Sequence, residues 1–122
     1  MYSVEIGQSK HLLVISAFQH VTAEQARQAA QRVRELLHDV APGFRVLGDY
    51  RWLDSMDSGA ARHVAKIMDA FAEKGIASVT RVMPDPHKDI GLNILSHFHY
   101  GPKIQIGTFE TLADAVQSMV AE

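Results

Sequence analysis

The stretch LDSMDSGAARHV, residues 53–64, decides how this chain divides into strands and helices. Before it, the segment FRVLGDY at 44–50 is typical of a short strand. After it, apolar residues recur at the spacing of one helix face, and these are Val64, Ile67, Met68 and Phe71. Gly75 stands where the C-terminal cap of that helix belongs. We therefore expect a strand, a polar loop and a helix that begins at Ser58.

The same alternation of strands and helices continues on both sides of this unit. Further strands are expected over 1–6, 11–18, 76–83 and 103–107, the first two as a hairpin. Further helices are expected after three caps, which are Thr22 with Gln25 as its capping-box partner, Asp89, and either Thr108 or Thr111. The order β-β-α-β-α-β-α-β-α indicates a mixed, mostly parallel sheet of four or five strands with about four helices, most of them on one side.

Size and composition narrow the class of protein. The chain has 122 residues, 47% of them hydrophobic, which is enough for one domain with its own core over residues 1–122. It contains no cysteine and has a net charge of −2, so a reducing, cytoplasmic setting is expected and a nucleic-acid surface is not. No secretory signal or membrane span is expected, because the longest apolar run, Leu12 to Ile15, suits a buried strand.

The order of elements and the polar loop resemble the STAS domain of bacterial anti-sigma factor antagonists, the SpoIIAA-like proteins. In that family a strand ends near "DLS", and a loop reading "DSSG" or "DSTG" opens the next helix. Asp49 and Asp57 match its two aspartates without a gap, and GTFETLADAVQSM at 107–119 is similar to its last turn and helix. The resemblance implies an α/β STAS-like sandwich and a regulatory protein that binds a kinase-like or sigma-regulatory partner.

The resemblance also implies a serine or threonine before the loop glycine that accepts phosphate from the partner kinase. The ungapped alignment places Gly59 at this acceptor position, so that the acceptor is replaced. Alignment on the glycine restores Ser58 as the acceptor, at the cost of a one-residue deletion after Asp49. Ser58 is therefore the candidate phosphorylation site.

The loop residues have a structural interpretation as well as a functional one. Ser58 and Asp57 are suited to cap the helix, by accepting from free N–H groups and by complementing the helix dipole. The same N–H groups would attract a phosphate, although the nearby aspartates would repel it. The candidate interaction loop consists of Trp52, Asp54, Ser55, Asp57, Ser58 and Gly59.

Two aromatic residues flank this loop at the end of a strand, where open α/β sheets usually place their ligand sites. Tyr50 and Trp52 beside Arg51 are suited to contact a partner or to line a small pocket, since aromatic residues and arginine dominate interface energetics. The alternative is that Trp52 folds back over the edge of the core.

Metal and catalytic sites are not predicted. His97 and His99 would point about 200° apart on a helix and need His87 as a third ligand, so solvated histidines and no metal or other cofactor are expected. A Ser58–His63 nucleophile pair lacks an orienting group, and no hydrolase, phosphate-loop or metalloprotease motif is present. The chain is therefore expected not to be an enzyme.

The expected third helix suggests a second function. Its apolar residues Leu92, Ile94, Leu95 and Phe98 have histidines and Tyr100 at their margin, and such a helix can cover an apolar pocket. The preferred function is a non-catalytic protein-interaction or regulatory module, in which Asp57 positions the loop, Ser58 caps or contacts, and Trp52 anchors the partner. The alternative is a domain that binds a small molecule or lipid beside the third helix. A homo-oligomer is compatible with both.

Overall fold

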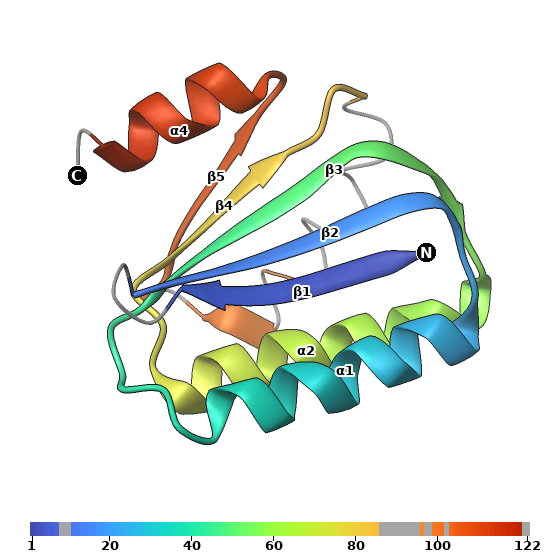
Figure 1. The fold of residues 1–122 in the computed structure, drawn as a ribbon, viewed down its shortest axis with the longest axis horizontal. Coiled ribbons are helices and arrows are strands. Elements are labelled where there is room, and N and C mark those ends of the chain that lie inside the picture. The colour runs from blue at the N-terminus through green and yellow to red at the C-terminus, as the bar shows by residue number, and fades with distance from the viewer. Residues whose placement is uncertain (8–10, 86–95, 97–98, 102, 121–122) are drawn as a thin grey trace.

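The computed structural model describes residues 1–7, 11–85, 96, 99–101 and 103–120. Its sheet has five strands in the order β1-β2-β3-β4-β5 (Figure 1). They are β1 (Tyr2–Gly7), β2 (Leu12–Val21), β3 (Arg45–Met56), β4 (Ser78–Val82) and β5 (Gln105–Phe109). β1 is antiparallel to β2, and the other neighbouring pairs are parallel. The mixed, mostly parallel sheet and the opening hairpin are confirmed.

Helices cover both faces of this sheet. Helices α1 (Ala23–Leu37) and α2 (Ala61–Lys74) lie together under one face, and α4 (Leu112–Val120) lies on the opposite face beside β4 and β5 (Figure 1). A short 3₁₀ helix, η2 (Ser58–Ala60), precedes α2. Two of these three α-helices therefore share one side, as the sequence predicts.

The two faces have separate hydrophobic cores because side chains alternate along each strand. Val46 packs toward α1 and α2, whereas its neighbour Leu47 packs with Val82 and α4. The larger core includes the predicted stripe of α2, with Ile67, Met68 and Phe71 buried. The rings of Phe44 and Phe71 meet edge to face within it, 6.3 Å apart.

The predicted end of the third strand is wrong. The expected strand stops at Tyr50, but β3 continues to Met56 and contains Asp54 and Ser55, which were assigned to the loop. The reason is that β2 is also longer than expected and stays paired with β3 as far as Val21 and Met56. Backbone pairing between strands thus overrides the polar composition of this segment.

The predicted third helix falls mostly outside the described residues, as do Asp89 and the apolar residues of its stripe. Ser96, His99 and Tyr100 are described and are helical, and Tyr100 packs into the larger core. The last strand is shifted from the expected 103–107 to Gln105–Phe109.

Three predicted caps are confirmed by their hydrogen bonds or backbone angles. Thr22 and Gln25 form a reciprocal capping box at the start of α1. Thr111, rather than Thr108, caps α4, because its hydroxyl accepts from the Asp114 N–H at 3.1 Å. Gly75 ends α2 in the left-handed region, with φ of 79°.

The substitution Gly75→Ala should lower the free energy of unfolding by about 1 kcal/mol, because a Cβ is strained at this φ. Space is not the limit, since the added Cβ would lie 3.5 Å from the Cβ of Pro42. The control is Gly7→Ala, whose Cβ would meet the Leu12 carbonyl oxygen at an ordinary 3.9 Å and no closer atom of the described residues. Urea unfolding should separate the two variants, and equal stability would show that the cap contributes nothing.

Candidate functional site

The site is assembled where β2 and β3 end. A β-bulge shifts their register so that Gln19 lies opposite Leu53, but the next residue, His20, lies opposite Ser55. Asp54 is the extra residue of β3, and Gln19 has a positive φ of 55°. Bulges of this kind redirect side chains. Here the bulge brings His20 into register with Ser55.

His20 links two of the predicted loop residues. Its Nδ1 lies 2.7 Å from the Ser55 hydroxyl, and its Nε2 lies 2.7 Å from Oδ1 of Asp57. The side chains of His20 and Asp57 are 47% and 43% exposed, so the group is open to solvent. Residues from two strand ends and the following turn thus form one hydrogen-bonded chain, which we call the Ser55–His20–Asp57 chain.

Asp57 also holds the start of another helix. Its second carboxylate oxygen, Oδ2, accepts from the Ala23 N–H at 2.9 Å, at the first turn of α1. This backbone hydrogen bond, followed by the one with His20, lowers the pKa of Asp57 from its ordinary value of 3.8. The carboxylate therefore stays ionised at neutral pH and fixes the strand ends relative to α1.

The predicted capping role of Asp57 and Ser58 at their own helix is wrong. Asp57 precedes η2 and Ala60 precedes α2, and neither makes a side-chain cap hydrogen bond. The Asp57 side chain is engaged by His20 and Ala23 instead. The chain continues from η2 directly into α2, so the helix begins as a 3₁₀ turn.

The remaining candidates of the interaction loop are not part of the Ser55–His20–Asp57 chain. Asp54, Ser58 and Gly59 are exposed. A Cβ on Gly59 would lie 3.3 Å from the Cβ of Ala23, which is a tight contact between the starts of α1 and α2. Gly59 therefore allows the two helix starts to approach closely, while Ser58 remains accessible.

Trp52 is presented on the surface. It is 61% exposed, and the Arg51 guanidinium lies 5.7 Å from the centre of its ring. Arg51 is in turn held by both carboxylate oxygens of Asp49, at 3.0 and 2.9 Å, and this contact lowers the pKa of Asp49. Trp52 pairs across the sheet with the half-buried Phe18. The alternative that Trp52 folds over the core is excluded.

The Tyr50 side chain lies in a different environment from that of Trp52. It is half-buried and lines a cavity of about 50 Å³ between the sheet and helices α1 and α2. The Tyr50 ring covers Gly48, where a Cβ would come within 2.9 Å of the phenol oxygen. The expected Tyr50–Trp52 pair is thus divided, because the two side chains lie in different environments.

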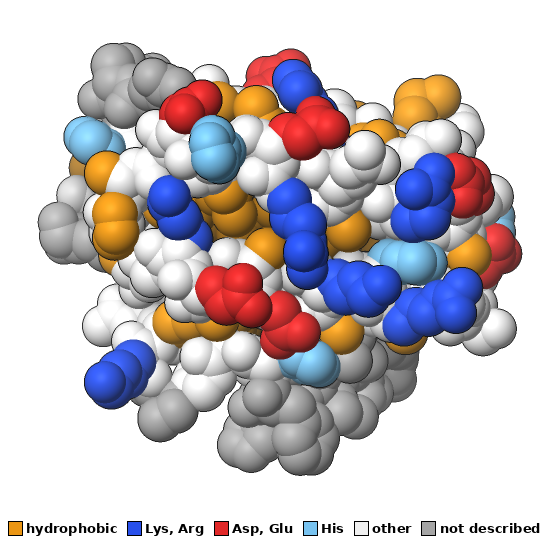
Figure 2. All heavy atoms as spheres, turned by 90° about the horizontal axis from the view of Figure 1, so that it is seen from below, with side chains coloured by type: hydrophobic (Ala, Val, Ile, Leu, Met, Phe, Trp, Pro, Cys, Tyr) orange, Lys and Arg blue, Asp and Glu red, His pale blue; other side chains and the backbone are white. Residues whose placement is uncertain are grey.

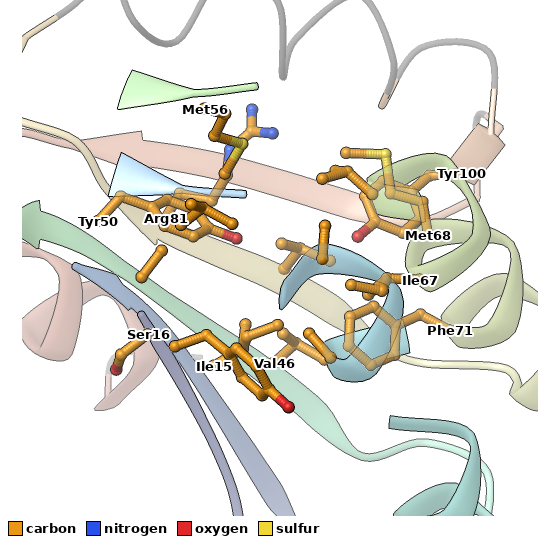
Figure 3. Close-up of a pocket in the computed structure, with 17 residues that line it drawn as sticks. Ile15, Ser16, Val46, Tyr50, Met56, Ile67, Met68, Phe71, Arg81 and Tyr100 are labelled. Atoms are coloured by element: carbon orange, nitrogen blue, oxygen red, sulfur yellow. The ribbon is translucent and has the colours of Figure 1, made fainter. Parts of the chain in front are cut away.

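The cavity has an apolar wall and a few polar groups. Tyr100 and Tyr50 point toward each other across it (Figure 3), and burial raises the pKa of Tyr100. Arg81 is 2% exposed and also lines the cavity, while its guanidinium donates to the Ser96 hydroxyl at 2.8 Å. Tyr100, near the end of the predicted third helix, is the described residue of that segment that lines the cavity.

His63 does not form the nucleophile pair considered from the sequence. It is buried on α2, and its Nε2 accepts from the Nε of Arg62 at 3.3 Å. Burial and the nearby charges of Arg62, Lys66 and Arg27 lower its pKa. The face of the molecule that α1 and α2 form carries several Lys and Arg side chains with carboxylates among them (Figure 2).

Among the described residues, no three His, Asp or Glu side chains could hold a metal ion together. His99 bonds Asp69 of α2 through Nδ1 at 2.6 Å, whereas His87 and His97 lie outside the described residues. Within the described part of the chain, no helix is long and apolar enough to cross a bilayer.

Comparison with known proteins identifies the fold. No family model matches the sequence, and no curated protein matches it. An uncharacterised DUF3478-family protein with a SpoIIAA-like fold from Shewanella loihica PV-4 superposes with a TM-score of 0.71 at 20% identity, over 97% of this chain and 91% of that one.

Two structures of SpoIIAA also superpose. The unphosphorylated anti-sigma factor antagonist SpoIIAA gives a TM-score of 0.63 at 17% identity, over 100% of both chains. The phosphorylated Bacillus cell fate determinant SpoIIAA gives 0.63 at 16% identity, over 98% of this chain and 99% of that one. At such low identity the likeness establishes the fold alone, and the predicted STAS-like, SpoIIAA-like fold is confirmed.

His20 is the residue of this site that sequence reasoning missed. It lies two residues before Thr22, the cap of α1, and just after the expected end of the second strand at residue 18. No motif marks it. Its partners Ser55 and Asp57 follow 35 and 37 residues later. The sequence contains both the histidine and the serine. Which residues face each other depends on the register of β2 and β3, and local sequence patterns do not give that register.

The substitution Asp57→Ala should lower the melting temperature by a few degrees at about pH 7, because the Ala23 N–H and His20 both lose their acceptor. The pKa of Asp57 is lowered by folding, so its stabilising effect is present above 3.8 and is lost as the pH falls through the lower folded value. The difference from wild type should therefore shrink at about pH 2.5.

Asp54→Ala is the matched control for this experiment, because Asp54 is an exposed acid on the same strand end. Thermal unfolding followed by circular dichroism should show a melting temperature close to that of the wild type at both pH values. If Asp57→Ala melts like this control at neutral pH, the carboxylate does not hold the helix start.

Proposed function

We propose that this protein is a protein-interaction and regulatory module that docks its partner on the surface around Trp52 and on the adjacent start of α2. The observation that carries the proposal is an aromatic side chain that is 61% exposed and yet held in place. Tryptophan is enriched among the interface residues that dominate binding energies, and a partner would bury this exposed side chain.

The surroundings of Trp52 reduce the cost of binding. Asp49 holds Arg51, and Arg51 lies over the Trp52 ring, so part of the side-chain ordering is complete before a partner arrives. Phe18 lies on the neighbouring strand in register with Trp52, and among the described residues it is not a member of either hydrophobic core. An apolar centre with a charged margin is the usual composition of a protein–protein interface.

The partner proposed is a kinase-like or sigma-regulatory protein, and the location proposed is the cytoplasm. Support comes from the fold shared with an anti-sigma factor antagonist and from the absence of cysteine. Association with a second copy of the chain remains a further proposal. We propose no metal or other cofactor for this activity.

Ser58 is the proposed site of phosphorylation. It is exposed at the start of η2, and one structure that shares the fold is of a phosphorylated protein. Phosphate would add negative charge beside Asp57, and like charges repel, so the modification would alter binding rather than order the loop. Phosphopeptide mapping of the protein from its own host should find phosphate on Ser58; a phosphate on another serine would contradict this assignment.

The alternative function is that of a carrier of a small apolar ligand, and the support for it is the cavity that Tyr50 and Tyr100 line. That cavity measures about 50 Å³, whereas ligand pockets usually measure roughly 300–1,000 Å³. A lipid chain would require the helices to separate from the sheet. Native mass spectrometry of the protein from its own host tests this alternative, because a retained ligand would add a defined mass.

The substitution Trp52→Ala should weaken partner binding by about thirtyfold or more, corresponding to about 2 kcal/mol for an interface anchor. Stability should change by less than about 0.5 kcal/mol, since the side chain is exposed. The partner is first identified by affinity purification from the host with the wild-type chain, and its dissociation constant is then measured with purified proteins.

Val116→Ala is the matched control, because Val116 is 44% exposed on α4, away from the Trp52 surface. It should bind the partner as the wild type does. Equal affinity of Trp52→Ala and wild type, or loss of binding in both variants, would contradict docking at Trp52.

A further inference from the structure

The protonation of the Ser55–His20–Asp57 chain follows from its geometry. A carboxylate only accepts, so in the neutral imidazole Nε2 carries the proton and donates to Asp57 Oδ1 at 2.7 Å. Nδ1 then has a free lone pair, and the Ser55 hydroxyl at 2.7 Å donates to it. The serine is therefore hydrogen-bonded to a base whose tautomer is set by a third group.

We infer that Ser55 is a nucleophile for acyl transfer, with His20 as its general base and Asp57 as the positioning residue. A hydroxyl, a base within 2.6–3.2 Å and an orienting group are the parts that nucleophilic serine sites share on unrelated folds. This activity goes beyond the proposed interaction function, and it departs from the expectation that the chain is not an enzyme.

Two features of the backbone hold His20 and Ser55 opposite each other and so support the inference. Gln19, directly before His20, has a φ of 55°, which costs energy for a residue with a side chain, and a β-bulge lies at the same point. In a regular register His20 would lie opposite Asp54, and the bulge places it opposite Ser55 instead. Asp57 is itself fixed by the Ala23 N–H, so the orienting carboxylate has little freedom.

The proposed reaction is the hydrolysis of an ester through an acyl-serine, and it requires only the ester and water as reactants. The Ser55 oxygen attacks the ester carbonyl while its proton passes to Nδ1 of His20, and the acyl–oxygen bond of the ester then breaks. The leaving alcohol takes the proton from His20. Water attacks the acyl-serine by the same route, releases the acid and restores the hydroxyl.

The surroundings define the substrate class. The His20 and Asp57 side chains are 47% and 43% exposed, so the substrate approaches from solvent. The carboxylates of Asp54 and Asp57 lie one and two residues from Ser55 in sequence and would repel an anion. A small, neutral ester with a good leaving group therefore fits the site better than an acyl phosphate.

The test uses the full chain with a fluorophosphonate, which leaves a stable phosphonyl group on a nucleophilic serine, and with 4-nitrophenyl acetate as substrate. Peptide mass mapping should place the phosphonyl group on Ser55. Ser55→Ala should lose both the label and the release of 4-nitrophenolate. His20→Gln should slow labelling about a hundredfold, the lower end of the usual contribution of a general base.

Ser118→Ala is the control, because Ser118 is a serine of α4, outside the Ser55–His20–Asp57 chain and outside the proposed docking surface. It should be labelled and should release 4-nitrophenolate as the wild type does. Three results would each overturn the inference. They are absence of the label on Ser55, unchanged labelling in His20→Gln, and release of 4-nitrophenolate by the wild type that is no faster than by Ser55→Ala. Circular dichroism confirms that each variant is folded.

Discussion

The parallel pairing of β2 with β3, continued past two bulges to Val21 and Met56, is the interaction on which the functional end of this protein depends. It keeps both strands extended as far as the starts of α1 and α2, with Val21 and Leu53 still buried in the larger core. If the pairing stopped at Tyr50, Trp52 would not be held in a strand. The exposed site is therefore held both by the backbone pairing of the two strands and by the burial of the apolar residues that alternate with it.

Asp57 joins the three elements that meet at this end. Its backbone N–H donates to the Val21 carbonyl at 2.9 Å, and its two carboxylate oxygens reach His20 and the Ala23 N–H. One residue thus connects the end of β2, the turn after β3 and the first turn of α1. Gly59 also lies close to Ala23 at this junction, where an added Cβ would make a tight contact of 3.3 Å with the Ala23 Cβ.

The sheet separates the two functions considered for this chain. Trp52 faces solvent beside the half-buried Arg51 and is suited to a protein partner, whereas Tyr50, Arg81 and Tyr100 line a cavity of about 50 Å³. Tyr50 and Trp52 are two residues apart, and a regular strand would place them on the same face. The bulge between the Ser16–Asp49 and Phe18–Trp52 pairs reverses that expectation.

Local patterns in the sequence were sufficient for much of the fold and for part of the site. The apolar stripe of α2, the Thr22–Gln25 capping box and the left-handed Gly75 each depend on residues close together in the chain, and all three are confirmed. Trp52 as an exposed residue was one of two interpretations that the sequence left open. The end of β3 was missed because its polar residues are held by pairing with β2, which composition does not show.

The sequence by itself therefore determined the order of the elements, the mostly parallel sheet and the α/β class, because helix and strand periodicities are local properties. Only the tertiary structure decided that Asp57 serves α1 instead of its own helix and that His20 meets Ser55, 35 residues away. Those contacts depend on strand register and on the position of a bulge. A shift of one residue in that register would place His20 opposite a different side chain.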